Sequence, residues 1–116
     1  MRKLIALLLL IQTLPALAEE RRLTGEEIRT ALSDKTVEST GGDGKPYTQI
    51  FQKGGLTIYN AGPQSSSNGF WDVRGNQYCS QWPPNESWSC YDMTGEGDRL
   101  TFIAASGKMW PVRVLP

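Results

Sequence analysis

Apolar residues follow a helical period in one segment near the start of the chain and a strand period through most of the rest. Between Leu23 and Ser33 they recur at helical spacing, with Thr24 at the N-cap and Glu27 three residues later. This is the capping-box spacing, in which each side chain accepts a hydrogen bond from the other residue's backbone amide. The pattern predicts one helix over residues 23–33, whose narrow apolar stripe packs on a larger element.

After Lys35, short runs alternate between apolar and polar residues and are separated by glycine-rich turns, which is typical of hairpin-connected strands. The expected strands are residues 36–39, 47–53, 56–59, 70–74, 77–82, 87–93, 99–104 and 108–115. Such connections give an antiparallel meander, and closing the meander removes its exposed edges. We therefore expect a mainly β fold: one N-terminal helix, then about eight short strands forming a small up-and-down β-barrel.

The alternative is a curved open sheet with the helix packed on it. Pro111 lies inside the last expected strand. Proline cannot donate a backbone hydrogen bond, so within sheets it is confined to edges, strand starts and bulges. Pro111 therefore indicates an edge position or a bulge.

The stretch over residues 69–93 holds both cysteines and three of the four tryptophans. A two-residue turn at 75–76 places Trp71 opposite Ser80, and strand alternation then assigns the side chains to two faces. The expected core face carries Trp71, Val73, Tyr78, Ser80, Ser89, Tyr91 and Met93. The expected outer face carries Phe70, Asp72, Arg74, Cys79, Gln81, Trp88, Cys90 and Asp92.

The beginning of the chain has the three parts of a secretory signal peptide: a positive start, an apolar run over residues 4–14 and small residues before the cut. The apolar run is shorter than the roughly 20 residues that span a membrane. We expect a signal peptide over residues 1–18, cleaved after Ala18, and a single β-rich domain over residues 19–116. The mature protein would be periplasmic or secreted, with no membrane span after cleavage.

Cys79 and Cys90 are the two cysteines of the chain. In an exported protein two cysteines form a disulfide more often than they stay free or bind metal. We therefore expect a Cys79–Cys90 bridge that fixes the register of two neighbouring strands.

Charge and composition narrow the possible chemistry. Without Arg2 and Lys3, the mature chain has 10 basic and 12 acidic residues, a net charge of −2, and no basic patch, which disfavours nucleic acid as a partner. The chain has no histidine, which removes the commonest general base and the commonest metal ligand. We expect no cofactor and no metal site.

Two sets of aromatic residues are candidates for recognition. Trp71, Tyr78, Tyr91 and Trp110 would line a ligand pocket, since barrels of about eight strands can hold one small ligand. The alternative is that the same residues pack as a filled core, which is the more usual role of such aromatic residues. Trp82 and Trp88 would form a surface-interaction site at the tip of the disulfide hairpin, because exposed aromatic residues on a braced loop make a preorganised binding element.

A carboxylate hydrolase is a more distant alternative. Asp72 and Asp92 are expected on one face of nearby strands, and a glycosidase needs two carboxyl groups at a defined separation beside a sugar cleft. Charged residues on an outward strand face are usually only solvated, and Arg74 is a neighbouring partner for Asp72. We assign no catalytic residue on this basis.

The order Gly69-x-Trp71, Tyr78-Cys79 and Trp88-x-Cys90-Tyr91 resembles small exported domains of Gram-negative bacteria whose function is uncharacterised. In architecture alone the chain is also similar to lipocalin-like and avidin-like barrels. The first resemblance implies a periplasmic β-rich domain and supplies no catalytic residue. We therefore expect a non-enzymatic binding domain that holds a small apolar or aromatic ligand in the barrel. The alternative is an interaction or inhibitor module whose partner is an envelope protein.

Overall fold

The computed structural model describes residues 21–40, 43–63 and 65–116, so the expected signal peptide lies outside the described residues. The elements are α2 (Gly25–Leu32), β1 (Lys35–Thr40), β2 (Pro46–Phe51), β3 (Leu56–Asn60), β4 (Ser66–Arg74), β5 (Gln77–Gln81), β6 (Trp88–Glu96), β7 (Arg99–Ile103) and β8 (Met109–Val114). Among the described residues, no helix is both long and apolar enough to cross a membrane.

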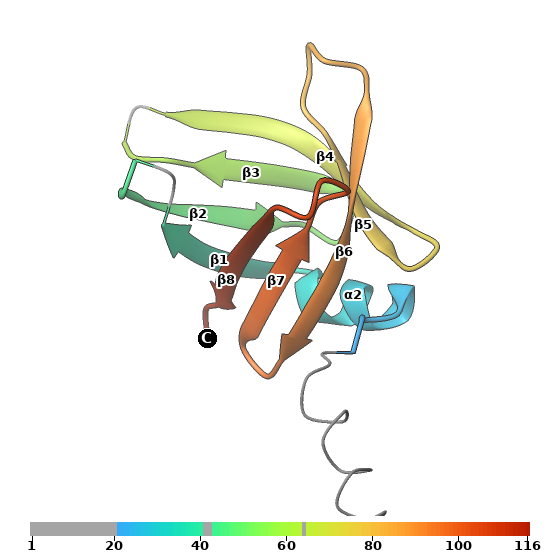
Figure 1. Ribbon diagram of the computed structural model, residues 1–116. Coiled ribbons are helices and arrows are strands. Elements are labelled where there is room, and N and C mark those ends of the chain that lie inside the picture. Colours follow the sequence, from blue (N-terminus) through green and yellow to red (C-terminus); the bar gives the residue numbers. More distant parts are fainter. Residues whose placement is uncertain (1–20, 41–42, 64) are drawn as a thin grey trace, which may run out of the picture.

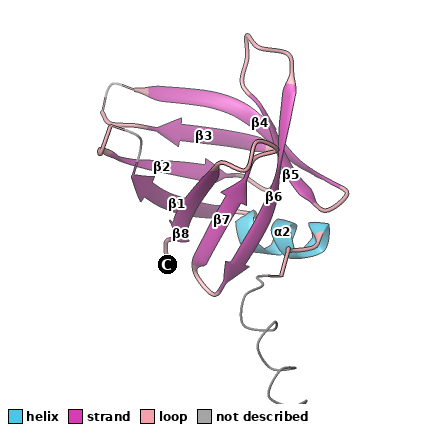
Figure 2. Cartoon of the chain, viewed as in Figure 1, coloured by secondary structure: helices cyan, strands magenta, loops and turns pink. Residues whose placement is uncertain are grey.

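The eight strands form a closed antiparallel barrel in chain order, with β1 paired to β8 (Figure 1). Figure 2 shows the same arrangement coloured by secondary structure, with α2 beside the strands. The expected helix-then-meander fold is confirmed, and the open-sheet alternative is wrong. Closure leaves no free sheet edge to template pairing with another chain.

The strand register matches the prediction made from the turn at residues 75–76. Trp71 pairs with Ser80, and Cys79 pairs with Cys90 on the next strand. The Cys79–Cys90 disulfide is present, and Cys79 is fully buried. The bridge thus connects directly opposite positions of β5 and β6, where it prevents a register slip.

The barrel closes through a short ladder, in which Val37 pairs with Val114 and Glu38 pairs with Arg113. Every second backbone N–H of β8 faces β1, as that of Leu115 does when it donates to the Thr36 carbonyl. Pro111 occupies one of these positions, two residues before Arg113. Proline has no N–H, and the Ser39 hydroxyl instead donates to the Pro111 carbonyl at 2.6 Å. Pro111 therefore lies where the β1–β8 ladder ends. It is part of a closed barrel and does not lie on a free sheet edge.

Helix α2 covers one end of the barrel, beside the β4–β5 turn (Figure 1). Its apolar stripe points inward, and Ile28 and Leu32 are fully buried in the core. Gly25 makes the close approach possible, because a Cβ atom there would lie 2.2 Å from the Gly75 carbonyl oxygen. The short apolar stripe predicted from the sequence thus closes one end of the barrel and joins the barrel core.

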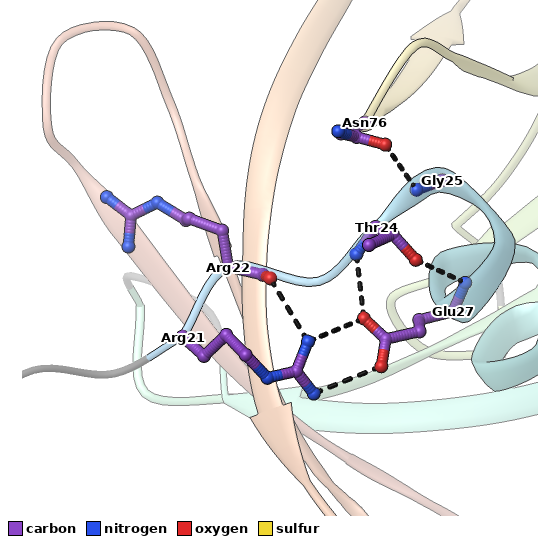
Figure 3. Close-up of polar contacts among 6 residues, drawn as sticks. All are labelled: Arg21, Arg22, Thr24, Gly25, Glu27 and Asn76. Carbon is purple, nitrogen blue, oxygen red and sulfur yellow. Dashed lines mark hydrogen bonds and ion pairs between the residues drawn. The ribbon is translucent and has the colours of Figure 1, made fainter.

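The start of the helix is fixed by a capping box (Figure 3). The Thr24 hydroxyl accepts from the Glu27 amide at 3.2 Å, and Glu27 Oε1 accepts from the Thr24 amide at 2.8 Å. Asn76 Oδ1 accepts from the Gly25 amide at 2.8 Å, which ties the helix start to the β4–β5 turn. Hydrogen bonding from Arg21, then from the Thr24 amide, lowers the pKa of Glu27 to about 2.

Replacing Thr24 by alanine should lower the free energy of unfolding by about 1 kcal/mol, the usual cost of losing an N-cap side chain. Thr30→Ala is the matched control, because Thr30 is exposed in the middle of the same helix. Urea denaturation followed by circular dichroism measures both variants. Equal stability of T24A and the wild type would mean that the cap does not hold α2 in place.

The interior is divided along the barrel axis. The half next to α2 is packed with large side chains, including Phe51, Met93 and Val37, all fully buried. Trp71 adds to this half, with its indole nitrogen donating to the Gln52 carbonyl at 2.8 Å. The filled half holds the fold together and leaves the opposite half free to form a site.

Candidate ligand-binding cavity

The barrel end away from α2 opens into a cavity of about 650 Å³. Every strand except β1 contributes to its lining, together with the first residues of the β5–β6 loop. The lining residues are Tyr47, Gln49, Tyr59, Ser66, Ser67, Asn68, Tyr78, Ser80, Trp82, Pro83, Tyr91, Phe102 and Trp110. This volume lies within the range of about 300–1,000 Å³ that is usual for small-molecule sites.

Aromatic rings form the walls. On β2 and β3, the centroids of the Tyr47 and Tyr59 rings lie 4.8 Å apart. On β6 and β8, the Tyr91 and Trp110 rings meet edge to face, with centroids 5.8 Å apart. All four side chains are only partly buried, so ring surface remains available to a bound molecule.

Tyr78 and Phe102 form the floor and separate the cavity from the packed half. Their ring centroids lie 5.0 Å apart, and both side chains are buried. Burial raises the pKa of Tyr78 to about 12, so its hydroxyl is protonated and neutral at physiological pH.

Gln49 brings an amide group to the inner wall. Its Nε2 donates to Thr57 Oγ1 at 3.0 Å and to the Tyr78 hydroxyl at 3.4 Å. Thr57 is fully buried and donates in turn to the Ile50 carbonyl at 2.8 Å. This chain of bonds holds the amide in one orientation. Both hydrogen bonds are donated by Gln49 Nε2, which leaves Gln49 Oε1 as an acceptor.

Trp82 folds into the cavity mouth, which corrects the prediction that it stands exposed at the hairpin tip. Its indole nitrogen donates to Ser80 Oγ at 3.2 Å, and its ring lies edge to face with Tyr59 at 6.4 Å. Gly69 makes room for it, because a Cβ atom there would lie 2.7 Å from the Trp82 ring. The sequence does indicate this inward position, because Tyr78, Ser80 and Trp82 alternate along the strand and so share one face.

The four predicted pocket residues do not stay together. Tyr78, Tyr91 and Trp110 line the cavity, whereas Trp71 is buried in the packed half and is absent from the lining. Trp71 lies toward the end of β4 that is nearer to α2. It pairs with Ser80 on β5, and its indole nitrogen donates to the Gln52 carbonyl near the closed end of the barrel. The four residues are therefore divided between the two halves of the barrel: Trp71 packs in the core, and the other three line the cavity.

Trp88 lies on the outer face, as predicted. The Arg74 guanidinium carbon sits 4.2 Å from the centroid of its ring, a cation–π contact. Trp88 and Trp82 therefore belong to opposite faces of the hairpin and do not form one site.

Asp72 and Asp92 also lie outside the barrel, away from the cavity. Asp72 is 3.4 Å from Arg29 and 3.5 Å from Arg74, and Asp92 is 3.6 Å from Arg22. Neither carboxylate lines the cavity, so the two do not form a pair beside a cleft there. Within the described part of the chain, no three metal-ligating side chains gather into a candidate metal site.

Sequence reasoning did not single out Tyr47, Gln49 or Tyr59 as site residues. The alternation of Tyr47, Gln49 and Phe51 on one face was visible. Alternation predicts which side chains face the interior, but it does not predict their positions along the barrel axis. Those positions decide whether a side chain lines the cavity or packs in the core.

No protein-family model, curated protein or solved structure matches the chain.

Proposed function

We propose that this protein is an exported, non-enzymatic binding protein that holds one small uncharged ligand in the open half of its barrel. The observation that carries the proposal is the composition of the cavity lining: among the described residues it has seven aromatic residues, five residues with a hydroxyl or amide group, one proline and no charged residue. Concave sites of this kind, mostly aromatic with a few oriented polar groups, are the usual form of a small-molecule site.

Export is part of the proposal. The Cys79–Cys90 disulfide is compatible with an oxidising compartment, where such bonds persist. The signal-peptide pattern of residues 1–18 also supports export, and we propose a periplasmic location on this basis. Fractionation of the native host, with detection of the cleaved chain, tests this part independently of ligand binding.

A cavity-blocking variant tests ligand binding. Ser67 lines the cavity at its rim, and Ser67→Trp should fill the space that a ligand would take. Native mass spectrometry of protein purified from its own host should show an additional bound mass that S67W loses. Ser87→Trp is the control, because Ser87 lies in the exposed β5–β6 loop and does not line the cavity. A bound mass that survives in S67W would place the ligand elsewhere.

Affinity should not change with pH between about 5 and 9. In the part of the chain that the structure describes, no Asp, Glu, Lys or Arg lines the cavity, and the full sequence has no histidine. Burial raises the pKa of Tyr47, and that of Tyr78 to about 12, so both hydroxyls remain protonated across this range. Titration calorimetry at pH 5, 7 and 9 with the ligand recovered from the host checks this. An affinity that falls tenfold within this range would show that a charged group takes part.

A surface-interaction role is the second candidate, and aromatic residues that are at least partly exposed on the outer faces of β4 and β6 favour it. Phe70 is 47% exposed and borders the same shallow surface depression as Trp88. Exposed aromatic residues are frequent at the centres of protein interfaces. Pull-down from an envelope extract with Phe70→Ala and Trp88→Ala tests this role, and partners unchanged in both variants would eliminate it.

A further inference from the structure

We infer that the ligand is a neutral sugar of one or two pyranose rings. The inference rests on the proposed function and adds the chemical class of the ligand. Three properties of the described lining carry it: its lack of charge, its lack of leucine, isoleucine, valine and methionine, and its mixture of ring faces with hydroxyl and amide groups.

The lack of charge disfavours ionic ligands. A carboxylate or phosphate inside the cavity would lose its hydration without gaining a cationic partner, which is costly. A cationic ligand, such as a quaternary ammonium, would be drawn to aromatic faces. However, the Lys108 ammonium, which is not part of the cavity lining, lies 5.0 Å from the centroid of the Trp110 ring, so this ring already has a cationic partner. A neutral ligand avoids both problems.

The aliphatic residues of the interior lie elsewhere. Ile28, Leu32, Val37 and Leu100 belong to the buried core, and no leucine, isoleucine, valine or methionine is part of the lining. A lipid tail in this cavity would cover the hydroxyl and amide groups of the wall without hydrogen-bonding to them, and each unsatisfied group would cost free energy. The cavity is therefore poorly suited to fatty acids and similar chains.

Ring faces combined with hydrogen-bonding groups match the two kinds of surface of a pyranose. Its C–H groups carry partial positive charge and can lie on the negative face of an aromatic ring, such as Tyr59 on β3 or Trp110 on β8. Its hydroxyl groups both donate and accept. Gln49 Oε1 is an oriented acceptor, while Ser67 and Asn68 at the rim supply groups of both kinds. A cavity of about 650 Å³ has room for one or two such rings.

The experiment uses saturation-transfer NMR and calorimetry on the purified protein with a defined panel. The sugar probes are glucose, maltose, N-acetylglucosamine and N,N′-diacetylchitobiose. The comparison probes are indole, choline and decanoate, which represent neutral aromatic, cationic and fatty-acid ligands. We expect at least one sugar to bind, with Tyr59→Ala weakening it by about tenfold or more, equivalent to about 1.4 kcal/mol. Met109→Ala should leave the affinity unchanged, because Met109 is 60% exposed and does not line the cavity.

A free sugar and the end of a glycan chain share this chemistry. Comparing the best disaccharide with its longer oligosaccharide separates the two sources: tighter binding of the longer chain would indicate a glycan end at the open mouth. Weaker binding would indicate a free sugar, and either result supports the inference.

Two results would overturn it. Binding of indole, choline or decanoate without any sugar would show that the ligand class is wrong, while the cavity would still be a ligand site. Binding of no sugar by a protein that carries a bound mass from its host would do the same. A protein with neither host ligand nor bound probe would contradict the proposed function itself.

Discussion

Replacing Phe51 by alanine should lower the free energy of unfolding by about 3–5 kcal/mol, the largest effect we expect from a single substitution. Phe51 is fully buried, and its ring centroid lies 5.7 Å from those of both Trp71 and Tyr78. Truncation would remove these contacts and leave a void next to the cavity floor. Urea denaturation followed by fluorescence measures the change.

Phe70→Ala provides the comparison for this prediction, because the same ring on the outer face of β4 is 47% exposed. We expect it to cost less than about 1 kcal/mol. Similar losses in F51A and F70A would contradict the division of the barrel into a packed interior and an exposed outer face.

Removing the disulfide by Cys79→Ala with Cys90→Ala should cost about 3 kcal/mol in the chain-entropy model. The bond closes a short loop, with a sequence separation of 11, and joins residues that are directly opposite on β5 and β6. The loss arises mainly in the unfolded chain, which gains conformational freedom without the bridge. The folded barrel and its cavity should therefore persist in the double variant.

Denaturation with and without reductant measures this effect. The wild type should unfold at lower urea concentration when reduced, and the double variant should be insensitive to reductant. A wild type whose unfolding midpoint does not move on reduction would show that the bridge contributes nothing to stability.

Local patterns in the sequence were sufficient to predict much of the fold. The capping box of Thr24 and Glu27, and the register around the turn at residues 75–76, each depend on neighbours a few positions apart. Strand alternation separated inner from outer side chains for the same reason. Barrel closure followed from the continuous meander, since a chain of hairpins can remove its edges by pairing its first and last strands.

Positions along the barrel axis were not predictable in the same way. Trp71 and Trp110 both face inward, yet one is packed in the closed half and the other lines the cavity. The difference depends on which end α2 covers, and that in turn depends on the contact of Gly25 with the β4–β5 turn. This contact joins segments 50 residues apart and leaves no local periodic signal.

Trp82 depends both on local strand alternation and on a contact with a neighbouring strand. Alternation from Tyr78 and Ser80 already places it on the inner face, but its position at the tip of the disulfide hairpin suggested an exposed side chain. The space over Gly69, on the neighbouring strand, is what admits its ring. A glycine opposite an aromatic residue was the missing cue.

The central claim is that the half of the barrel away from α2 is an open ligand site and not a collapsed core. An atomic-resolution crystal structure of the protein purified from its own host tests this most directly. We predict electron density for a small molecule between Tyr59 and Trp110, above the ring of Tyr78. Side chains of Tyr59 and Trp110 in van der Waals contact, with no volume left between them, would contradict the claim.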